Sequence, residues 1–241
     1  MTDPQLSPAA RLFVALDTPD RAVAERLIRL LSPYAAGFKI GKTLFTAVGP
    51  PIVAAALDAG ARVFLDLKFH DIPHTVAGAT AAAARLGVHL CTVHALGGRA
   101  MLQAAQDAVA GQPAGVARPI LLGVTLLTSA DQAMLEEVGL TGTPETVAQR
   151  LARLSIACGL GGIVCSPREI AGVRRIAPDD FVIVTPGIRP KDAASDDQQR
   201  IATPSEALAA GATYLVVGRP IIAAPDPVAA AQRLLEDIAA S

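Results

Sequence analysis

The stretch FLDLKFHDIPHTV, residues 64–76, carries most of the chemical information in this chain. Its first half alternates between two faces as a β-strand does, so that Phe64, Asp66 and Lys68 share one face. Burying a carboxylate and an ammonium side by side costs on the order of several kcal/mol per ion unless the two are paired. A second carboxylate, Asp71, follows just past the strand. The pattern therefore indicates either a buried structural ion pair or a charged functional site at the carboxyl end of a strand.

Apolar runs with the content of short β-strands lie on both sides of this stretch, separated by Ala- and Leu-rich segments of helical periodicity. Gly60, Gly87 and Gly211 are placed to end three of the helical segments. Helix starts with proline in the first turn are expected at residues 18–19, 166–169 and 203–206, the last two as capping boxes. The expected strands are residues 11–17, 37–41, 62–68, 89–96, 119–127, 161–166, 181–188 and 212–219.

Eight strands that alternate with eight helices predict an α/β fold, a (β/α)8 TIM barrel, with a doubly wound open sheet as the alternative. The barrel is favoured because such barrels hold their sites at the carboxyl ends of the strands, where this chain keeps its polar residues. The residues at or just past those ends are Asp17, Lys39, Asp66, Lys68, His94, Thr128, Ser166, Arg189 and Arg219. Because no linker or change in composition marks a second domain, we expect one barrel domain over residues 11–241, after a disordered tail at residues 1–10.

The composition excludes several classes of partner. Hydrophobic residues make up 51% of the chain but aromatic residues only 3%, which favours a core of Ala, Val, Ile and Leu around buried parallel strands. The net charge of -1 provides no basic field for nucleic acid, and no apolar run is long enough to span a membrane. Cys91, Cys158 and Cys165 lack a C-x-x-C spacing, so we expect buried free thiols in a reducing compartment. These observations together predict a cytoplasmic protein that binds a small molecule.

The segments after the last two expected strands indicate a phosphate site. In (β/α)8 barrels these loops commonly bind phosphate, because glycine lets backbone N–H groups approach and arginine adds charge-assisted hydrogen bonds. Gly218 and Arg219 are suited to this role, although a surface arginine beside a turn glycine is the simpler alternative. The polar run from Arg189 to Arg200 is expected to form a mobile loop over the barrel mouth.

Several strings together resemble one family. A close resemblance to the bacterial type of the orotidine 5'-phosphate decarboxylase family is carried by FLDLKFHDIPHTV together with VALD, FKIGKTLF, VTLLTS, TPGIRP, the DQQR that follows it, and VVGRP. The resemblance spans all eight expected strands. The D-x-K-x-x-D pattern alone is shared with hexulose phosphate synthases and ketogulonate phosphate decarboxylases, whereas DIPxT combined with TPGIRP and the downstream glutamine is more specific.

The resemblance implies roles for the matching residues. Lys68 is expected to protonate C6 of the pyrimidine as carbon dioxide leaves, with Asp66 and Asp71 flanking it and Lys39 completing an alternating row of charges. It also implies a homodimer in which Asp71 is supplied across the subunit interface. The expected substrate-binding residues are Asp17 and Thr75 at the ribose, Thr128 at the pyrimidine, Arg189, Gln198, Gly218 and Arg219 at the phosphate, and Lys39. His74 departs from the family, in which this position is commonly asparagine.

The implied reaction needs no cofactor. Loss of carbon dioxide from C6 leaves a vinyl carbanion that no ring position delocalises well, so the protein must supply a fixed positive charge and a proton at one point. Lys68 provides both, and flanking carboxylates favour its charged form. The chain lacks the H-E-x-x-H, G-x-S-x-G and G-x-G-x-x-G patterns of zinc proteases, serine hydrolases and dinucleotide sites, so we expect no metal and no cofactor.

Two other functions remain open on the residues alone. One is a magnesium-dependent aldolase or decarboxylase that acts on a sugar phosphate within the same group of barrels, and dependence on metal distinguishes it. The other is a non-catalytic nucleotide-binding barrel, which absence of turnover distinguishes, because binding alone does not require a lysine flanked by two carboxylates.

Overall fold

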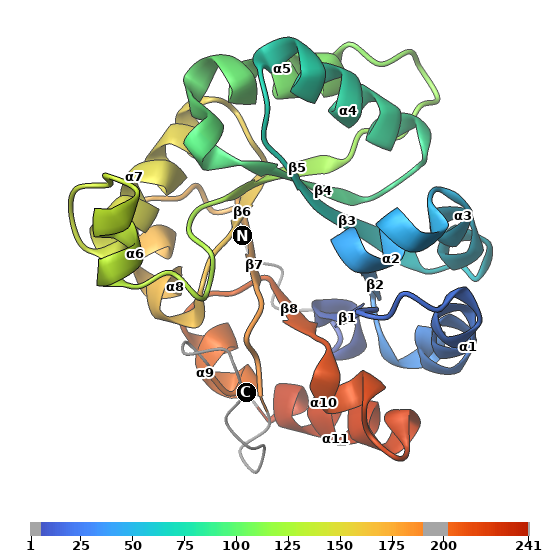
Figure 1. Cartoon of the computed structure of the whole chain (residues 1–241). Coiled ribbons are helices and arrows are strands. Elements are labelled where there is room, and N and C mark those ends of the chain that lie inside the picture. Colours follow the sequence, from blue (N-terminus) through green and yellow to red (C-terminus); the bar gives the residue numbers. More distant parts are fainter. Residues whose placement is uncertain (1–5, 190–201, 241) are drawn as a thin grey trace.

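The protein is a closed barrel of eight parallel strands in chain order, and helices surround it (Figure 1). This computed structural model describes residues 6–189 and 202–240. The strands are β1 (Leu12–Ala15), β2 (Gly37–Gly41), β3 (Arg62–Phe69), β4 (Leu90–His94), β5 (Ile120–Val124), β6 (Gly162–Val164), β7 (Val182–Thr185) and β8 (Tyr214–Val217). β1 pairs with both β2 and β8, which closes the sheet. The predicted (β/α)8 barrel is therefore confirmed, and the open sheet is excluded.

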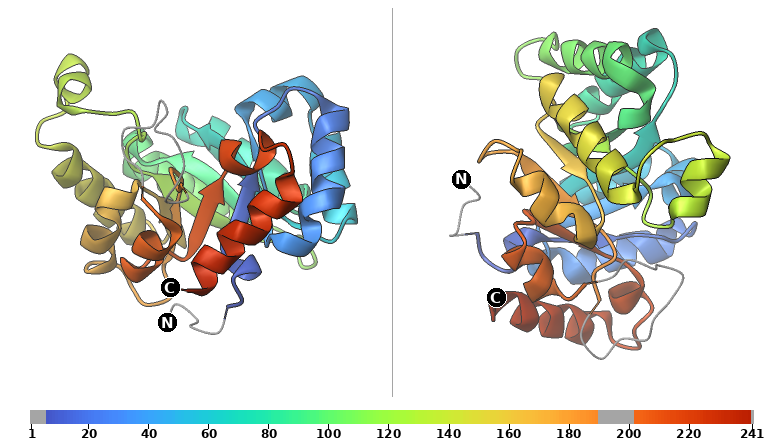
Figure 2. Two further views of the ribbon diagram at one scale, coloured as in Figure 1. Left: turned by 90° about the horizontal axis from the view of Figure 1, so that it is seen from below. Right: turned by 90° about the vertical axis from the view of Figure 1, so that its left-hand side faces the viewer.

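The helices form the outer layer, seen from two further sides in Figure 2. They are α1 (Arg21–Leu31), α2 (Lys42–Val48), α3 (Pro51–Asp58), α4 (Pro73–Arg85), α5 (Gly98–Ala110), α6 (Gln132–Glu137), α7 (Pro144–Ala157), α8 (Ile170–Arg174), α9 (Pro204–Ala209), α10 (Arg219–Ile222) and α11 (Pro227–Ala239). Short 3-10 turns are η1 (Ala9–Arg11), η2 (Ser32–Tyr34), η3 (Ala95–Gly97) and η4 (Pro167–Glu169). None of the described helices is long and apolar enough to cross a membrane.

Local signals place most of the helix ends. Capping boxes are present at both predicted sites, before η4 and before α9. Gly60, Gly87 and Gly211 adopt φ of 75°, 79° and 106°, a left-handed conformation that glycine reaches without a steric cost. The helix start predicted at residues 18–19 is wrong by two residues, because the carboxylate of Asp20 accepts the N–H of Val23 and caps α1 instead.

The expected run at residues 37–41 matches β2 at both ends, and the ends of the other runs differ from the strands by up to three residues. Most strands are shorter than predicted, since pairing stops before the apolar run does, whereas β3 extends one residue further, to Phe69. Of the expected tail, residues 1–5 lie outside the described residues, and Ala9–Arg11 form the turn η1 that leads into β1. The Arg189 to Arg200 loop also lies outside the described residues except for Arg189 itself.

Alternate residues of the strands build two separate apolar cores. One lies between the barrel and its helices, and the other fills the barrel interior. Inside the barrel Phe13 packs edge to face against Phe64, with ring centroids 6.0 Å apart, and against Tyr214, at 5.3 Å. The interior cluster comprises Phe13, Ala15, Phe64, Leu90, Leu122, Val182, Val184 and Val216. The barrel interior is thus a packed apolar core and not a channel.

The three cysteines are free and buried, as predicted. Burial, with a smaller contribution from Asp66, raises the pKa of the Cys91 thiol to about 12. Burial likewise raises the pKa of Cys165 well above its ordinary value. Both groups are therefore held as neutral thiols near pH 7, which makes them poor nucleophiles.

Candidate active site

A pocket of about 340 Å³ opens at the carboxyl ends of the strands. Its volume is within the usual range for a small-molecule site, roughly 300 Å³ and above. Eight of the predicted site residues line it, namely Asp17, Lys39, Asp66, Lys68, Thr128, Arg189, Gly218 and Arg219. The barrel therefore brings together residues from the first, second, third, fifth, seventh and eighth strand ends, which are far apart in the sequence.

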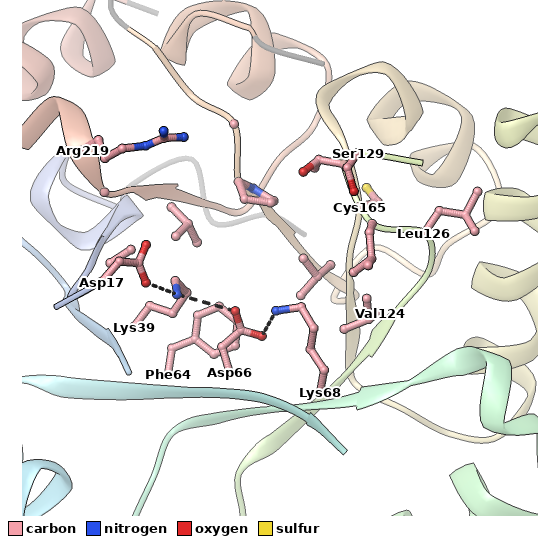
Figure 3. A pocket seen from close by; sticks show the side chains of 18 of the residues that line it. Asp17, Lys39, Phe64, Asp66, Lys68, Val124, Leu126, Ser129, Cys165 and Arg219 are labelled. Carbon is pink, nitrogen blue, oxygen red and sulfur yellow. Dashed lines mark hydrogen bonds and ion pairs between the residues drawn. The ribbon is translucent and has the colours of Figure 1, made fainter. Parts of the chain in front are cut away.

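Four charged side chains form a row of alternating sign along one wall of this pocket (Figure 3). Lys39 Nζ lies 3.1 Å from Asp17 Oδ1 and 3.7 Å from Asp66 Oδ2. Lys68 Nζ lies 2.8 Å from Asp66 Oδ1, the shortest of the three ion pairs. Asp66 is buried, with 8% of its surface exposed, whereas the side chain of Lys68 is 25% exposed toward the cavity. Each ammonium in the row is thus paired, and Lys68 remains accessible to a ligand.

A bulge in β3 places Lys68. Pairing with β4 runs regularly up to Leu65, which faces Cys91, and resumes at Phe69, which faces Val93. Within the bulge Lys68 has φ of 52°, and it is the one non-glycine residue of the described chain with positive φ. Phe64, Asp66 and Lys68 all line the pocket, as the alternation predicted, but the sequence did not indicate the bulge. Bulges often occur beside functional sites, where they redirect a side chain.

A hydroxyl that sequence reasoning missed ties the bulge together. The Lys68 backbone N–H donates to Thr92 Oγ1 at 2.8 Å, and that hydroxyl donates to Asp66 Oδ1 at 3.1 Å. Thr92 is fully buried on β4. Its position two residues after Leu90, which faces the barrel interior, was the available signal, because residues two apart share a face of a strand.

The electrostatics of Asp66 follow from these neighbours. Burial by itself would raise the pKa of this carboxyl. The ammonium groups of Lys68 and Lys39 and the hydrogen bonds from Lys68 and Thr92 outweigh burial, so that its pKa is held below the ordinary value. Asp66 is therefore a carboxylate at neutral pH, and it is a fixed counter-charge for the two lysines.

Three predicted site residues do not line this pocket. Asp71 and Thr75 are exposed beside it, and Asp71 Oδ1 accepts the backbone N–H of Ile72 at 2.6 Å. No ion pair joins Asp71 to Lys68 within the described part of this single chain. Gln198 lies outside the described residues. His74, also exposed, starts the same helix as Thr75 and lines neither the pocket nor its rim.

Asp71 instead borders a second, shallower hollow together with His70, Ile72, Pro73, Leu96 and Gly97. Two apolar side chains are unusually exposed there, Ile72 at 65% and Leu96 at 38%. Next to the hollow the rings of His70 and His94 stack with centroids 5.2 Å apart. Burial, followed by the charges of His70, Lys68 and Lys42, lowers the pKa of His94 to about 4, so that this imidazole is neutral at pH 7.

The remaining wall of the pocket is mostly apolar. Ser129 also lines the pocket, and the sequence analysis did not predict it as a site residue. The apolar lining consists of Ala15, Phe64, Val124, Leu126, Leu127, Val164, Pro186 and Val216. Phe64 was predicted on the same strand face as Asp66 and Lys68, whereas for the other apolar residues only the closure of the barrel shows that they face the cavity. A pocket with both an apolar lining and a charged row suits an apolar ring with polar substituents at one edge.

Comparisons with known proteins agree with this geometry. The model of the orotidine 5'-phosphate decarboxylase / HUMPS family matches residues 10–234. The chain is 54% identical to orotidine 5'-phosphate decarboxylase of Halorhodospira halophila, over 96% of this chain and 97% of the relative. It is 52% identical to the enzyme of that name from Moorella thermoacetica, over 95% of this chain and 92% of the relative.

Among solved structures, orotidine 5'-phosphate decarboxylase from Lactobacillus acidophilus superposes with a TM-score of 0.80 at 38% identity, covering 94% of this chain and 98% of that one. The similarity in sequence and in structure extends over nearly the whole barrel, including every strand end that contributes to the pocket. The chain belongs to the orotidine 5'-phosphate decarboxylase / HUMPS family.

Proposed function

We propose that this protein decarboxylates orotidine 5'-phosphate to uridine 5'-phosphate, the last step of de novo pyrimidine nucleotide synthesis. The observation that carries the proposal is the paired Lys68 ammonium, 2.8 Å from Asp66, in a pocket that Arg189 and Arg219 also line, with Arg219 on the side away from Lys68 (Figure 3). A cation that can give up a proton at one end and arginines for a phosphate at the other match the two ends of this substrate.

Lys68 acts as the general acid in this proposal. The bond between C6 and the carboxylate carbon breaks, carbon dioxide leaves, and the electron pair stays on C6. A proton from Lys68 Nζ then forms the new C6–H bond, and the lysine regains a proton from solvent. The ammonium also stabilises the developing charge before the proton moves, which is the larger contribution where water is excluded. No cofactor enters this scheme, since no electron sink is required beyond the fixed charge.

Asp66 and Lys39 hold the acid in its reactive form. The two oxygens of Asp66 face different lysines, Oδ1 toward Lys68 and Oδ2 toward Lys39. The carboxylate is therefore held between the two ammonium groups and favours the charged form of both. Asp66 also lies beside the position of the substrate carboxylate, whose loss relieves a repulsion between like charges.

The remaining residues bind the parts of the substrate that do not react. In this proposal Asp17 and Lys39 bind ribose hydroxyls, Thr128 the pyrimidine edge, and Arg189, Gly218 and Arg219 the phosphate, and all six residues line the pocket. Gln198 is proposed as a further phosphate ligand on the strength of the resemblance alone. Figure 3 supports this division, because Arg219 lies on the Asp17 side of the pocket, away from Lys68.

We further propose a homodimer in which the partner subunit supplies Asp71 and Thr75. Both residues are exposed on one chain and neither reaches its own pocket, although they follow directly on the strand that carries Lys68. Ile72 and Leu96, exposed next to Asp71, provide apolar surface for such a contact. The interface would be isologous, so that each site receives Asp71 of the partner subunit. The buried free thiols also support a reducing, cytoplasmic location.

Mixing two inactive variants tests the shared site. Lys68→Ala and Asp71→Ala subunits, when exchanged, give heterodimers in which one site carries both native residues and the other carries neither. With random exchange, about a quarter of all sites are then intact, and activity should recover to about that fraction. Mass spectrometry can show that the subunits have exchanged. If they have exchanged and activity does not recover, the shared site is contradicted.

The reaction itself is tested by following the absorbance of orotidine 5'-phosphate after addition of purified protein treated exhaustively with EDTA. Turnover without added metal is expected. Strict dependence on Mg²⁺ would move the assignment to a sugar phosphate lyase of the same barrel group. Tight binding of uridine 5'-phosphate without turnover would instead identify a non-catalytic binding protein.

A further inference from the structure

The bulge in β3 depends on a single residue of β4. Between the pairs Leu65–Cys91 and Phe69–Val93, three residues of β3 oppose one residue of β4, and that one residue is Thr92. In regular parallel pairing one residue opposes one, so two backbone units of β3 lack ladder partners here. The Lys68 N–H, one of these groups, donates to the Thr92 hydroxyl.

The backbone of Lys68 requires such a restraint. A non-glycine residue with φ near +52° occupies the left-handed region, a strained conformation that persists only where the surroundings fix it. The 2.8 Å hydrogen bond to Thr92 fixes the Lys68 amide directly. Leaving this partly buried N–H unpaired would be unfavourable as well. The restraint therefore favours the bulged conformation over a regular strand.

The same hydroxyl restrains the carboxylate. Thr92 Oγ1 donates its one hydrogen to Asp66 Oδ1, the oxygen that also pairs with Lys68 Nζ. A hydroxyl has one donor and two acceptor sites, so both interactions can be made at once. The Thr92 hydroxyl thus contacts both the backbone of Lys68, the proposed acid, and the carboxylate of Asp66, the counter-charge of that acid. Thr92 itself is fully buried.

We infer that Thr92 is a positioning residue, whose hydroxyl sets the geometry of the Lys68–Asp66 pair through two hydrogen bonds. The catalytic part of this inference rests on the function proposed above, and the positional part does not. Thr92 is not a catalytic residue, since it lines no part of the cavity. Its removal should therefore impair the chemical step more than substrate binding, because the phosphate and ribose contacts lie elsewhere on the barrel rim.

Thr92→Val tests the inference, because valine keeps the shape of threonine and removes both hydrogen bonds. We expect kcat for orotidine 5'-phosphate to fall by at least about tenfold, with KM and the affinity for uridine 5'-phosphate within about threefold of the parent. Thr92→Ser retains the hydroxyl and should recover kcat to within about threefold. If Thr92→Val does not fold, Thr92→Ala provides the same comparison with serine.

Thr213→Val is the matched control. Thr213 Oγ1 accepts the backbone N–H of Ile183 at 3.1 Å, so it makes the same kind of bond between neighbouring strands, but at the start of β8 and away from the mouth. This variant should lose stability and keep kcat. Equal losses of kcat in Thr92→Val and Thr213→Val, or a failure of Thr92→Ser to recover it, would overturn the inference.

Amide hydrogen exchange separates this inference from the proposed function, since it does not depend on turnover. Exchange at Lys68 should accelerate at least about tenfold in Thr92→Val and return to the parent rate in Thr92→Ser, while Thr213→Val accelerates exchange at Ile183 and leaves Lys68 unchanged. Unchanged exchange at Lys68 in Thr92→Val would overturn the positional inference even if the parent decarboxylates its substrate. An inactive parent with the expected exchange would instead contradict the proposed function alone.

Discussion

The two ends of the barrel interior are built by the same strands and have opposite character. Toward the strand starts, Phe13 packs edge to face against Phe64 and Tyr214 in an apolar layer, and Phe64 also lines the pocket. Two residues further along β3, Asp66 and Lys68 belong to a row of four charges. The surroundings therefore change from apolar to charged over one or two layers of side chains. Two residues of a strand span about 7 Å.

This difference separates stability from function along the barrel axis. Apolar burial at the closed end is favourable and nearly independent of direction, on the order of 25 cal/mol per Å². At the open end, charges are taken out of water and gain little net stability from pairing, but their geometry is specified by directional contacts. Substitutions at the mouth should accordingly change rates, and substitutions at the closed end should change stability.

Lys68→Ala should produce the largest effect at the mouth. Removing the proposed acid is expected to lower turnover by about 10³-fold or more, since a general acid alone contributes about 10²–10⁴ and the fixed charge is lost as well. The fold and a measurable affinity for uridine 5'-phosphate should remain, which calorimetry can check. Turnover within about tenfold of the parent would exclude Lys68 as the acid.

Arg219→Ala tests the part of the mouth that lies far from C6. We expect kcat/KM to fall by about 10², the scale of one or two charge-assisted hydrogen bonds. Part of the loss should be in kcat, because phosphate binding also stabilises the reactive state. Orotidine, which lacks the phosphate, should be a very poor substrate that added phosphite dianion partly rescues. A normal rate with orotidine would contradict the phosphate site.

Gly41→Ala adds a single methyl group at the mouth and tests whether the rate depends on the position of Lys39. A Cβ at this position would lie 2.9 Å from Lys39 Nζ and 3.5 Å from Asp17 Oδ1, so the lysine must move away from its present position. We expect kcat/KM to fall by about tenfold, through loss of alignment in the charged row. The melting temperature should change little, because the displaced group is the end of a flexible side chain. An unchanged kcat/KM would show that the position of Lys39 is not critical.

Phe13→Leu is the corresponding change at the closed end. Loss of two edge-to-face contacts should lower the free energy of unfolding by about 1 kcal/mol, or about 2–4 °C in melting temperature, with kcat within about twofold of the parent. Thermal denaturation and steady-state kinetics on the same sample check both expectations. A large loss of kcat without loss of stability would contradict the separation of the two ends.

The dependence of stability on pH should come from both ends of the barrel. The pKa of His94 is lowered from 6.5 to about 4, so below pH 6.5 the unfolded chain binds a proton that the folded chain does not. Stability should therefore decrease between pH 6.5 and pH 4. The pKa of Asp66 is also lowered, so its contribution is present above pH 3.8 and is lost at lower pH. Burial, followed by the charge of Arg62, also lowers the pKa of His89, just before β4. His94→Asn should therefore flatten the interval between pH 6.5 and pH 4 in part and leave the loss from Asp66 unchanged.

The barrel fold and the charged face of β3 could be predicted from local patterns in the sequence. Strand alternation, helix periodicity, the two capping boxes and the glycine helix ends all depend on neighbouring residues, so they can be read without knowing the fold. Asp66 and Lys68 were recognisable for the same reason, since a carboxylate and an ammonium on one face of an apolar strand have no simple role in packing.

The contacts of Thr92 and the separation of Asp71 from the pocket of its own chain could not be predicted from the sequence, because both depend on tertiary structure. Three residues of β3 oppose one residue of β4 because the register is fixed when the barrel closes, and no local pattern encodes that register. A threonine within an apolar run is indistinguishable from ordinary strand content until its hydroxyl is seen between Lys68 and Asp66. Asp71 is only five residues after Asp66 in the sequence, but it lies between the end of β3 and the start of α4 and borders the second hollow. The two carboxylates therefore do not line the same pocket of one chain.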